Sequence, residues 1–301
     1  MSEPLSAASA AAPRFSPRVL VPLALVSVYL VWGSTYLAIR IGLESYPPFT
    51  MAALRFLSTG ALLYAFLRWR GVAKPTMLQW RNCAVTGTLL LGFGNGLVCW
   101  AQQTVSSGLA AVAVASMPLF AAIFGAWFGQ WPRRLELLGL LVGFAGVILL
   151  NIGGDLAGSR LGALALLAAA ASWAFGSLWS KRQDMPEPMM NTAAQMLTGG
   201  VALTVLALIN GNGLPVAPTL RATLALAYLA VFGSIIGFSA YLYLLRTVRP
   251  ALATSYAYVN PPVAVIFGAL LANERVHALD IIGMAVILGG VAIITLARDK
   301  S

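Results

Sequence analysis

Charged side chains are scarce in this chain: only 9% of its 301 residues are Asp, Glu, Lys or Arg, whereas 59% are hydrophobic. A soluble globular protein has about 25% charged and about 45–50% apolar residues. With so few charges the chain could not cover a water-exposed surface, so lipid must solvate much of it. The scarcity argues against a soluble globular protein and predicts an integral membrane protein.

Histidine and cysteine are nearly absent, with one His277 and two cysteines, Cys83 and Cys99. The cysteines lie 16 residues apart in one apolar segment, too far along a helix to form a disulfide, so we expect them to be packing residues. The sequence contains no cluster of metal ligands, no phosphate-binding loop and no nucleophile–histidine pair. We therefore expect no metal, no cofactor and no enzymatic activity, and an ATP-driven pump is not supported.

Ten apolar stretches are long enough to span a bilayer, which takes about 20 mostly apolar residues. They cover residues 19–40, 47–67, 80–103, 106–128, 134–152, 160–180, 188–210, 219–245, 250–272 and 278–297. Residues 1–18 have no apolar run and predict a disordered cytoplasmic tail rather than a cleavable signal peptide. Because the connections are short, we expect one all-helical membrane domain with ten transmembrane helices.

The distribution of Lys and Arg predicts the orientation, because these residues prefer cytoplasmic loops. With the N-terminus inside, 14 of the 19 basic residues fall on the inner side, four fall on the outer side, and Arg55 lies within the second stretch. We therefore expect both termini in the cytoplasm. The basic residues lie between apolar stretches rather than on a polar domain, so the net charge of +10 does not indicate nucleic-acid binding.

The chain contains an internal repeat. Residues 104–129 align with residues 247–272 without a gap at an offset of 143, and ten of the 26 positions are identical. The identities include Pro118 with Pro261 and a run of four residues, Ile-Phe-Gly-Ala. A matched proline and a four-residue identity at one register make chance alignment of two apolar segments a poor explanation.

The repeat divides the chain into two halves, residues 19–152 and residues 160–297, and Trp32 in the first matches Trp173 in the second at an offset of 141. Each half has five predicted helices. Because five is odd, the second half would start on the opposite side of the membrane. This inverted-topology repeat is the architecture typical of secondary transporters.

Several short motifs occur in an order that resembles a known family: Trp32-Gly33-Ser34, Pro48, Arg55, and the prolines Pro118 and Pro261 ahead of the Ile-Phe-Gly-Ala runs. From about residue 20 to 297 the chain resembles the ten-helix EamA branch of the drug/metabolite transporter superfamily. Within that branch it looks most like bacterial amino-acid exporters, including an aromatic amino-acid exporter. The resemblance implies a central cavity shared by both halves and export of a small molecule across a bacterial inner membrane. We expect a monomer or weak homodimer in the bilayer.

Pro118 and Pro261 lie about twelve residues into their predicted helices, near the bilayer midplane. A proline there removes a backbone hydrogen bond and frees the carbonyls of Val114 and Ala257. Freed carbonyls are tolerated in a membrane only against protein or water. We interpret the prolines as helix-kink or gating residues beside the cavity; the alternative is a packing kink.

Polar side chains inside the predicted helices are costly in lipid and should face the bundle interior. Tyr256 and Asn260 are four residues apart and share a helix face, which makes them the leading candidates for substrate contact. Some polar residues will instead make interhelical hydrogen bonds, and glycines such as those in residues 92–96 would allow close helix approach. The further candidates for substrate contact are Tyr36, Asn95, Trp100 and Tyr243. Trp100 could equally belong to the aromatic belt at the membrane surface.

Trp32 and Trp173 lie near mid-helix, where they could wall the pocket or stack on a substrate, or simply pack in the core. Arg55 is about 12 Å deep in the second helix, and a charge at that depth is a functional candidate. It could bind a substrate carboxylate or anchor backbone carbonyls. Its repeat mate Gln195 keeps donors without charge, which favours the structural role.

The nine acidic residues all fall in tails, loops or ends of predicted helices: Glu3, Glu44, Glu136, Asp155, Asp184, Glu187, Glu274, Asp280 and Asp299. Proton-coupled carriers usually hold a titratable group near the pathway. We therefore expect a facilitator or exchanger of small metabolites, most plausibly amino acids. An exporter of drugs or cations, a non-transporting scaffold and a membrane-embedded enzyme are the alternatives.

Overall fold

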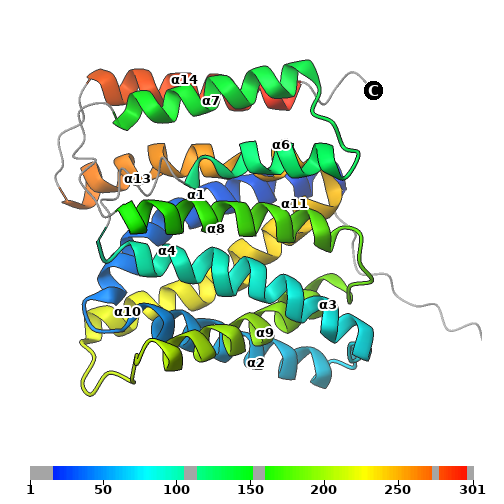
Figure 1. The fold of residues 1–301 in the computed structure, drawn as a ribbon, viewed down its shortest axis with the longest axis vertical. Helices are drawn as coiled ribbons and strands as arrows, with labels where there is room; N and C mark the ends of the chain where they lie inside the picture. Colours follow the sequence, from blue (N-terminus) through cyan, green and yellow to red (C-terminus); the bar gives the residue numbers. More distant parts are fainter. Residues whose placement is uncertain (1–15, 105–113, 152–159, 273–277, 297–301) are drawn as a thin grey trace, which may run out of the picture.

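The computed structural model describes residues 16–104, 114–151, 160–272 and 278–296. These residues form helices and turns and contain no strand. The helices are α1 (Pro17–Leu43), α2 (Pro48–Trp69), α3 (Met77–Gly87), η1 (Thr88–Asn95), α4 (Gly96–Ala101), α6 (Met117–Trp127), α7 (Arg134–Asn151), α8 (Arg160–Ser180), α9 (Pro188–Ile209), α10 (Leu220–Tyr228), η2 (Leu229–Phe238), α11 (Ser239–Thr247), α12 (Pro250–Ala253), α13 (Tyr256–Ala272) and α14 (Ala278–Leu296). Most of them run across the molecule in the same general direction as stacked layers (Figure 1).

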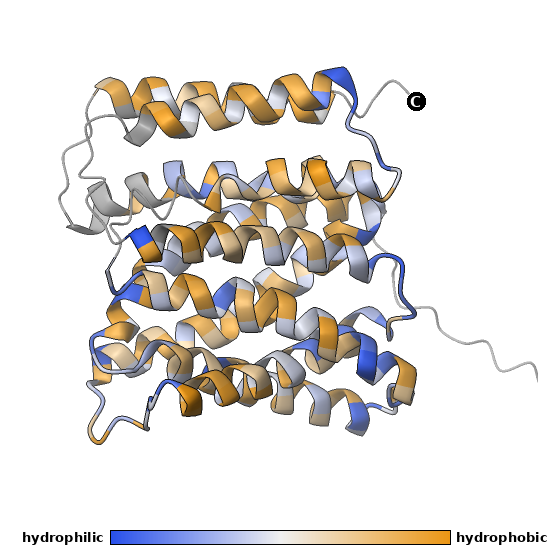
Figure 2. Cartoon of the chain, viewed as in Figure 1, coloured by the Kyte–Doolittle hydropathy of each residue, from blue (hydrophilic) through white to orange (hydrophobic). Residues whose placement is uncertain are grey.

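Within the described residues, six helical segments are long and apolar enough to cross a membrane, and two shorter apolar helices accompany them. Large apolar side chains such as Leu62 and Leu224 point outward and are more than half exposed, as expected when lipid is the solvent. Hydrophobic residues cover most helix surfaces, whereas hydrophilic residues gather mainly at the helix ends and connections (Figure 2). The chain is therefore an all-helical membrane protein, while the count of ten spans stays a prediction.

Local sequence explains where several helices begin. Thr76 and Gln79 form a reciprocal capping box at the start of α3. Pro48 and Pro188 occupy the first turns of α2 and α9, where the missing N–H has no partner to lose. Thr219 accepts a hydrogen bond from the backbone N–H of Ala222 and caps α10.

Most helix boundaries fall within a few residues of the prediction, and two differences matter. Helix α1 begins at Pro17, so Pro17 and Arg18 belong to a helix rather than to the predicted tail; residues 1–15 lie outside the described residues. The ninth predicted helix is interrupted at Thr254 and Ser255, which separate α12 from α13. The prediction for Cys83 and Cys99 is confirmed, because both are buried free thiols.

Two pi-helical segments occur where the sequence predicted regular helix. Segment η1 continues α3 into α4, and η2 continues α10 into α11. A pi-helical turn inserts one extra residue per turn, which re-aims side chains and is frequent at functional sites. The offset of 143 relates residues 88–95 of η1 to residues 231–238, inside η2.

Helix α2 packs along α9, and α7 packs along α14. The helices α7 and α14 approach closely because glycines have no side chain at the contact: a Cβ added at Gly290 would lie only 2.7 Å from the Cα of Gly143. Helix α1 contacts α13 and η2, whereas α8 contacts α6 and η1. These contacts bring α1, α8, α13 and the two pi-helical segments together in the middle of the bundle (Figure 1).

Candidate functional site

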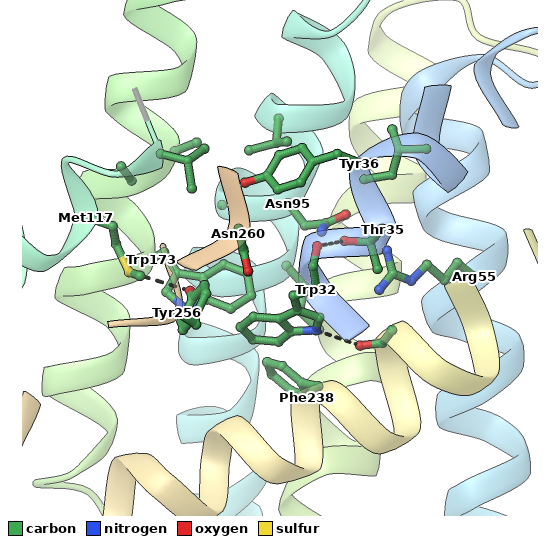
Figure 3. Close-up of a pocket in the computed structure, with 18 of the residues that line it drawn as sticks. Trp32, Thr35, Tyr36, Arg55, Asn95, Met117, Trp173, Phe238, Tyr256 and Asn260 are labelled. Carbon is green, nitrogen blue, oxygen red and sulfur yellow. Dashed lines mark hydrogen bonds between the residues drawn. The ribbon is translucent and has the colours of Figure 1, made fainter. Parts of the chain in front are cut away.

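A cavity of about 80 Å³ lies among α1, α2, η1, α6, α8, η2 and α13. It is lined by Trp32, Thr35, Tyr36, Ile39, Arg55, Phe56, Leu91, Gly94, Asn95, Val98, Val114, Met117, Ala169, Ala170, Trp173, Gly233, Phe238, Tyr256 and Asn260. Figure 3 shows these side chains converging from helices far apart in the sequence. The lining is mainly apolar with a few polar groups, as in typical small-molecule sites.

Seven of the nine predicted substrate-contact residues line this cavity: Trp32, Tyr36, Arg55, Asn95, Trp173, Tyr256 and Asn260. Trp100 and Tyr243 are not part of the lining and are half-buried against neighbouring helices. Pro118 and Pro261 do not line the cavity either, but the residues before them, Met117 and Asn260, do. Most of the residues predicted to contact substrate therefore line one cavity, and that they contact substrate stays a prediction.

The prolines are placed differently from each other. Pro118 lies in the first turn of α6, directly after a turn at Ala115 and Ser116. Pro261 lies inside α13, and the interruption of that helix is upstream at Thr254–Ser255. Residues 105–113, which hold the first part of the fourth predicted helix, are outside the described range.

Four aromatic rings meet on one side of the cavity. The ring centroid of Trp32 lies 5.5 Å from Trp173, 5.3 Å from Tyr241 and 4.6 Å from Tyr256. Tyr241 is also 5.7 Å from Trp173 and 5.6 Å from Tyr256. Edge-to-face and tilted pairs of this kind add to the stabilisation from burial. We call Trp32, Trp173, Tyr241 and Tyr256 the aromatic cluster.

The indole rings of the two tryptophans pack against glycines of the pi-helical segments. An added Cβ at Gly237 would lie 2.8 Å from Cδ1 of Trp32, and one at Gly94 would lie 2.7 Å from Cε3 of Trp173. Gly94 and Gly237 correspond at the repeat offset of 143. Each tryptophan thus packs on a glycine of the other half, where a larger residue would displace it.

The indole nitrogens of the two tryptophans differ in their partners. Trp32 Nε1 donates a hydrogen bond of 3.0 Å to the carbonyl oxygen of Gly233 (Figure 3). Trp173 Nε1 is buried and makes no hydrogen bond of normal geometry with any described residue, although the Tyr241 hydroxyl faces it. Asn260 Oδ1 likewise makes no hydrogen bond with any described residue, although the Tyr36 hydroxyl lies near the Asn260 amide group. Buried polar atoms without partners are costly and are candidates for ligand contact.

Arg55 reaches the cavity from α2 and is 4% exposed. Its Nε donates a 2.7 Å hydrogen bond to Ser234 Oγ, and its guanidinium lies 4.7 Å from the ring centroid of Phe56. The guanidinium also packs on Gly233, where an added Cβ would lie 2.6 Å from one of its terminal nitrogens. Segment η2 therefore positions both Arg55 and Trp32.

A salt bridge joins α7 to the residue before α12 at one end of the bundle. Glu136 is 3% exposed and is bound by Arg249, whose terminal nitrogen lies 2.9 Å from Oε2. Arg249 also donates to the Trp131 carbonyl oxygen at 3.1 Å. Burial, and secondarily the charge of Arg249, lowers the pKa of Lys181 just beyond α8. The sequence places Glu136 at a helix end but does not show that it is buried or that it is paired with the partly exposed Arg249.

Sequence reasoning also missed several lining residues. Met117 also lines the cavity, and the repeat offset of 143 relates it to Asn260, so the repeat could have identified Met117. Thr35 lies three residues after Trp32 on the same helix face. The role of Gly94 and Gly237 carried no sequence signal beyond the repeat itself.

The class of membrane protein follows from similarity to a known family. Residues 20–152 and 160–296 match the EamA-like transporter family. The chain belongs to this family and is therefore a membrane transporter.

A relative from Escherichia coli strain K12, named "Uncharacterized inner membrane transporter YedA", is 48% identical over 284 residues, covering 93% of each chain. The Arabidopsis thaliana chloroplastic WAT1-related protein At3g02690 is 29% identical over 279 residues, covering 88% of this chain and 66% of its own. A solved structure entitled "Crystal structure of protein" superposes with a TM-score of 0.77 at 23% identity, covering 95% of this chain and all of that chain. That structure supports the fold alone.

Proposed function

We propose that the chain is an exporter of small organic molecules, most plausibly amino acids, in a bacterial inner membrane. The observation that carries the proposal is the cavity, because it joins a mainly apolar lining to a buried arginine and an unpartnered asparagine oxygen. A carboxylate would be recognised by Arg55 and an apolar side chain by the aromatic cluster. The export direction rests on the family resemblance.

The proposed architecture is a ten-span inverted repeat with both termini in the cytoplasm. The pairing of helices supports it: α1 contacts α13 and η2, and its proposed mate α8 contacts α6 and η1, the corresponding mates. The proposed mates α2 and α9 contact each other, as do α7 and α14. The two ranges that match the family, residues 20–152 and 160–296, also support two equivalent halves.

Alternating access would move the substrate past this site. The cavity volume of about 80 Å³ is well below the roughly 300–1,000 Å³ of typical ligand pockets, so admitting a substrate requires helices or side chains to separate. Pro118, Pro261 and the break at Thr254–Ser255 are the proposed points of bending. The protein would act as a monomer or weak homodimer.

The proposed energy coupling is facilitated diffusion or exchange. No Asp, Glu or His is among the cavity-lining residues of the described chain. A proton-driven carrier usually places such a group beside its pathway. The same lack of a carboxylate argues against an exporter of cationic drugs.

Reconstituted flux tests the proposal. Purified protein in proteoliposomes should take up labelled amino acids from a panel without an imposed pH gradient, and uptake should rise when the vesicles are preloaded with the same amino acid. Uptake that requires a pH gradient would refute facilitated or exchange transport. A panel of labelled cationic drugs run in parallel separates the alternative exporter, and zero flux of every compound would favour a scaffold.

A further inference from the structure

The charge of Arg55 has no counter-ion in the described structure. Its two terminal guanidinium nitrogens make no hydrogen bond with any described residue, and no described carboxylate forms an ion pair with it. The side chain is 4% exposed and what remains accessible belongs to the cavity lining. A buried charge without a partner is strongly unfavourable, so an anion in the cavity would stabilise the protein.

The repeat places this charge in one half only. The mate of Arg55 is Gln195, which is fully buried and donates a 2.8 Å hydrogen bond to Asn191 instead of reaching the cavity. The cavity therefore has one positively charged wall, on α2 and η2, and no negatively charged wall among its described lining residues.

A substrate ammonium group would find weak partners in this cavity. The other polar side chains of its lining are Thr35, Tyr36, Asn95, Tyr256 and Asn260, together with the Trp173 N–H. None of these carries a negative charge, so an ammonium could donate hydrogen bonds only to neutral oxygens, such as the amide oxygens of Asn95 and Asn260 and the hydroxyls, or lie against ring faces. Repulsion by Arg55 would offset part of that gain.

We infer that the cavity recognises its substrates by their carboxylate and does not need their ammonium group. The substrate class is organic monocarboxylates with an apolar body, of which amino acids are one subset. The carboxylate binds at the terminal nitrogens of Arg55, and the apolar body lies against Trp32, Trp173 and Tyr256. This inference rests on the proposed function, because it concerns the same cavity.

Matched triplets of ligands test the inference: leucine, 4-methylpentanoate and isoamylamine; and phenylalanine, 3-phenylpropionate and phenethylamine. Binding to the purified full chain in nanodiscs is measured by the change in tryptophan fluorescence, because uncharged acids and amines cross bilayers unaided and would obscure flux. We expect each deaminated acid to bind at least as tightly as its amino acid. Each amine should bind at least about tenfold more weakly, the loss expected when a charge-assisted hydrogen bond is removed.

Variants of Arg55 test its role. Arg55→Gln makes the two repeat positions alike and should abolish the preference for acid over amine, whereas Arg55→Lys should retain the preference with weaker binding. Arg40→Gln, on the exposed surface of α1, is the matched control and should leave the preference unchanged. Gel filtration and thermal unfolding establish whether each variant is folded. If Arg55→Gln does not fold, Arg55→Lys and the wild-type triplets still test whether the cavity prefers carboxylates over amines.

The outcomes separate this inference from the proposed function. Tight binding of amino acids or amines together with failure of the deaminated acids would overturn the inference and leave the transporter proposal standing. No binding by any member of either triplet, together with no amino-acid flux, would overturn both. A preference for acids that survives in Arg55→Gln would refute the assignment to Arg55.

Discussion

Gly237→Ala tests whether the pi-helical segments position the site. The added Cβ would lie 2.8 Å from Cδ1 of Trp32, closer than real Cβ contacts come. Trp32 has little room to yield: it is 8% exposed, its Nε1 is bonded to the Gly233 carbonyl, and the Tyr256 ring centroid is 4.6 Å from its own. The substitution should therefore displace the indole from the cavity wall.

The size of the effect follows from those contacts. Overpacking a buried site typically costs about 1–3 kcal/mol. Loss of the indole hydrogen bond adds about 0.5–1.5 kcal/mol. If about 1.4 kcal/mol of this appears as lost substrate affinity, binding weakens about tenfold, and the rest lowers the melting temperature.

The assay combines thermal unfolding in detergent with amino-acid flux in proteoliposomes. Gly289→Ala on α14 is the control, because an added Cβ there meets no atom within 4 Å. Trp32→Phe in the Gly237→Ala background should raise the melting temperature above that of Gly237→Ala alone, since the smaller ring relieves the overlap, without recovering full flux. If Gly237→Ala alone keeps wild-type stability and flux, the claim that Trp32 is positioned by its packing on Gly237 is refuted.

Three further predictions concern the Glu136–Arg249 salt bridge and the unpartnered polar atoms. Glu136→Gln should lower the free energy of unfolding by about 1–3 kcal/mol, because Arg249 loses a charged hydrogen-bond partner; denaturant unfolding measures it, and an unchanged midpoint would contradict the reasoning. Trp173→Phe should weaken substrate binding more than it weakens stability, because its indole nitrogen has no partner in the protein, whereas Trp32→Phe should weaken both. Fluorescence binding and thermal unfolding measure the two effects. If both variants lose binding and stability to the same extent, the proposed difference between the two indole nitrogens is wrong. Asn260→Leu should preserve or raise stability by removing an unsatisfied buried oxygen and should reduce substrate affinity about fivefold or more, so loss of stability with normal affinity would argue for a structural role.

Periodic apolar stretches predicted most of the helices because a membrane span needs little more than length and hydropathy. Helices α2 and α9, for example, begin within a residue of the predicted starts at 47 and 188, where Pro48 and Pro188 favour a first helical turn. The interruption at Thr254–Ser255 was not predicted, because polar side chains inside a predicted span indicate which residues face protein and do not by themselves indicate a break in the helix.

The composition of the site was more predictable than its geometry. Polar and aromatic residues away from the helix ends, such as Trp32 and Asn260, must face protein rather than lipid, and that rule identified most of the polar and aromatic residues of the lining. It failed for Trp100 and Tyr243 because helix rotation depends on packing. The same rule could not predict that Trp32 packs on Gly237, because the extra residue of a pi-helical turn changes which side chains are in contact.

Cysteine modification inside the cavity tests the central claim most directly. Ala170→Cys places one thiol in the lining, whereas the native Cys83 and Cys99 are not part of the lining and should not compete. We predict that a charged thiol reagent reacts with this cysteine, that the reaction blocks amino-acid flux, and that saturating substrate slows the reaction. Modification that leaves flux intact, or that substrate does not slow, would contradict the claim that this cavity is the transport site.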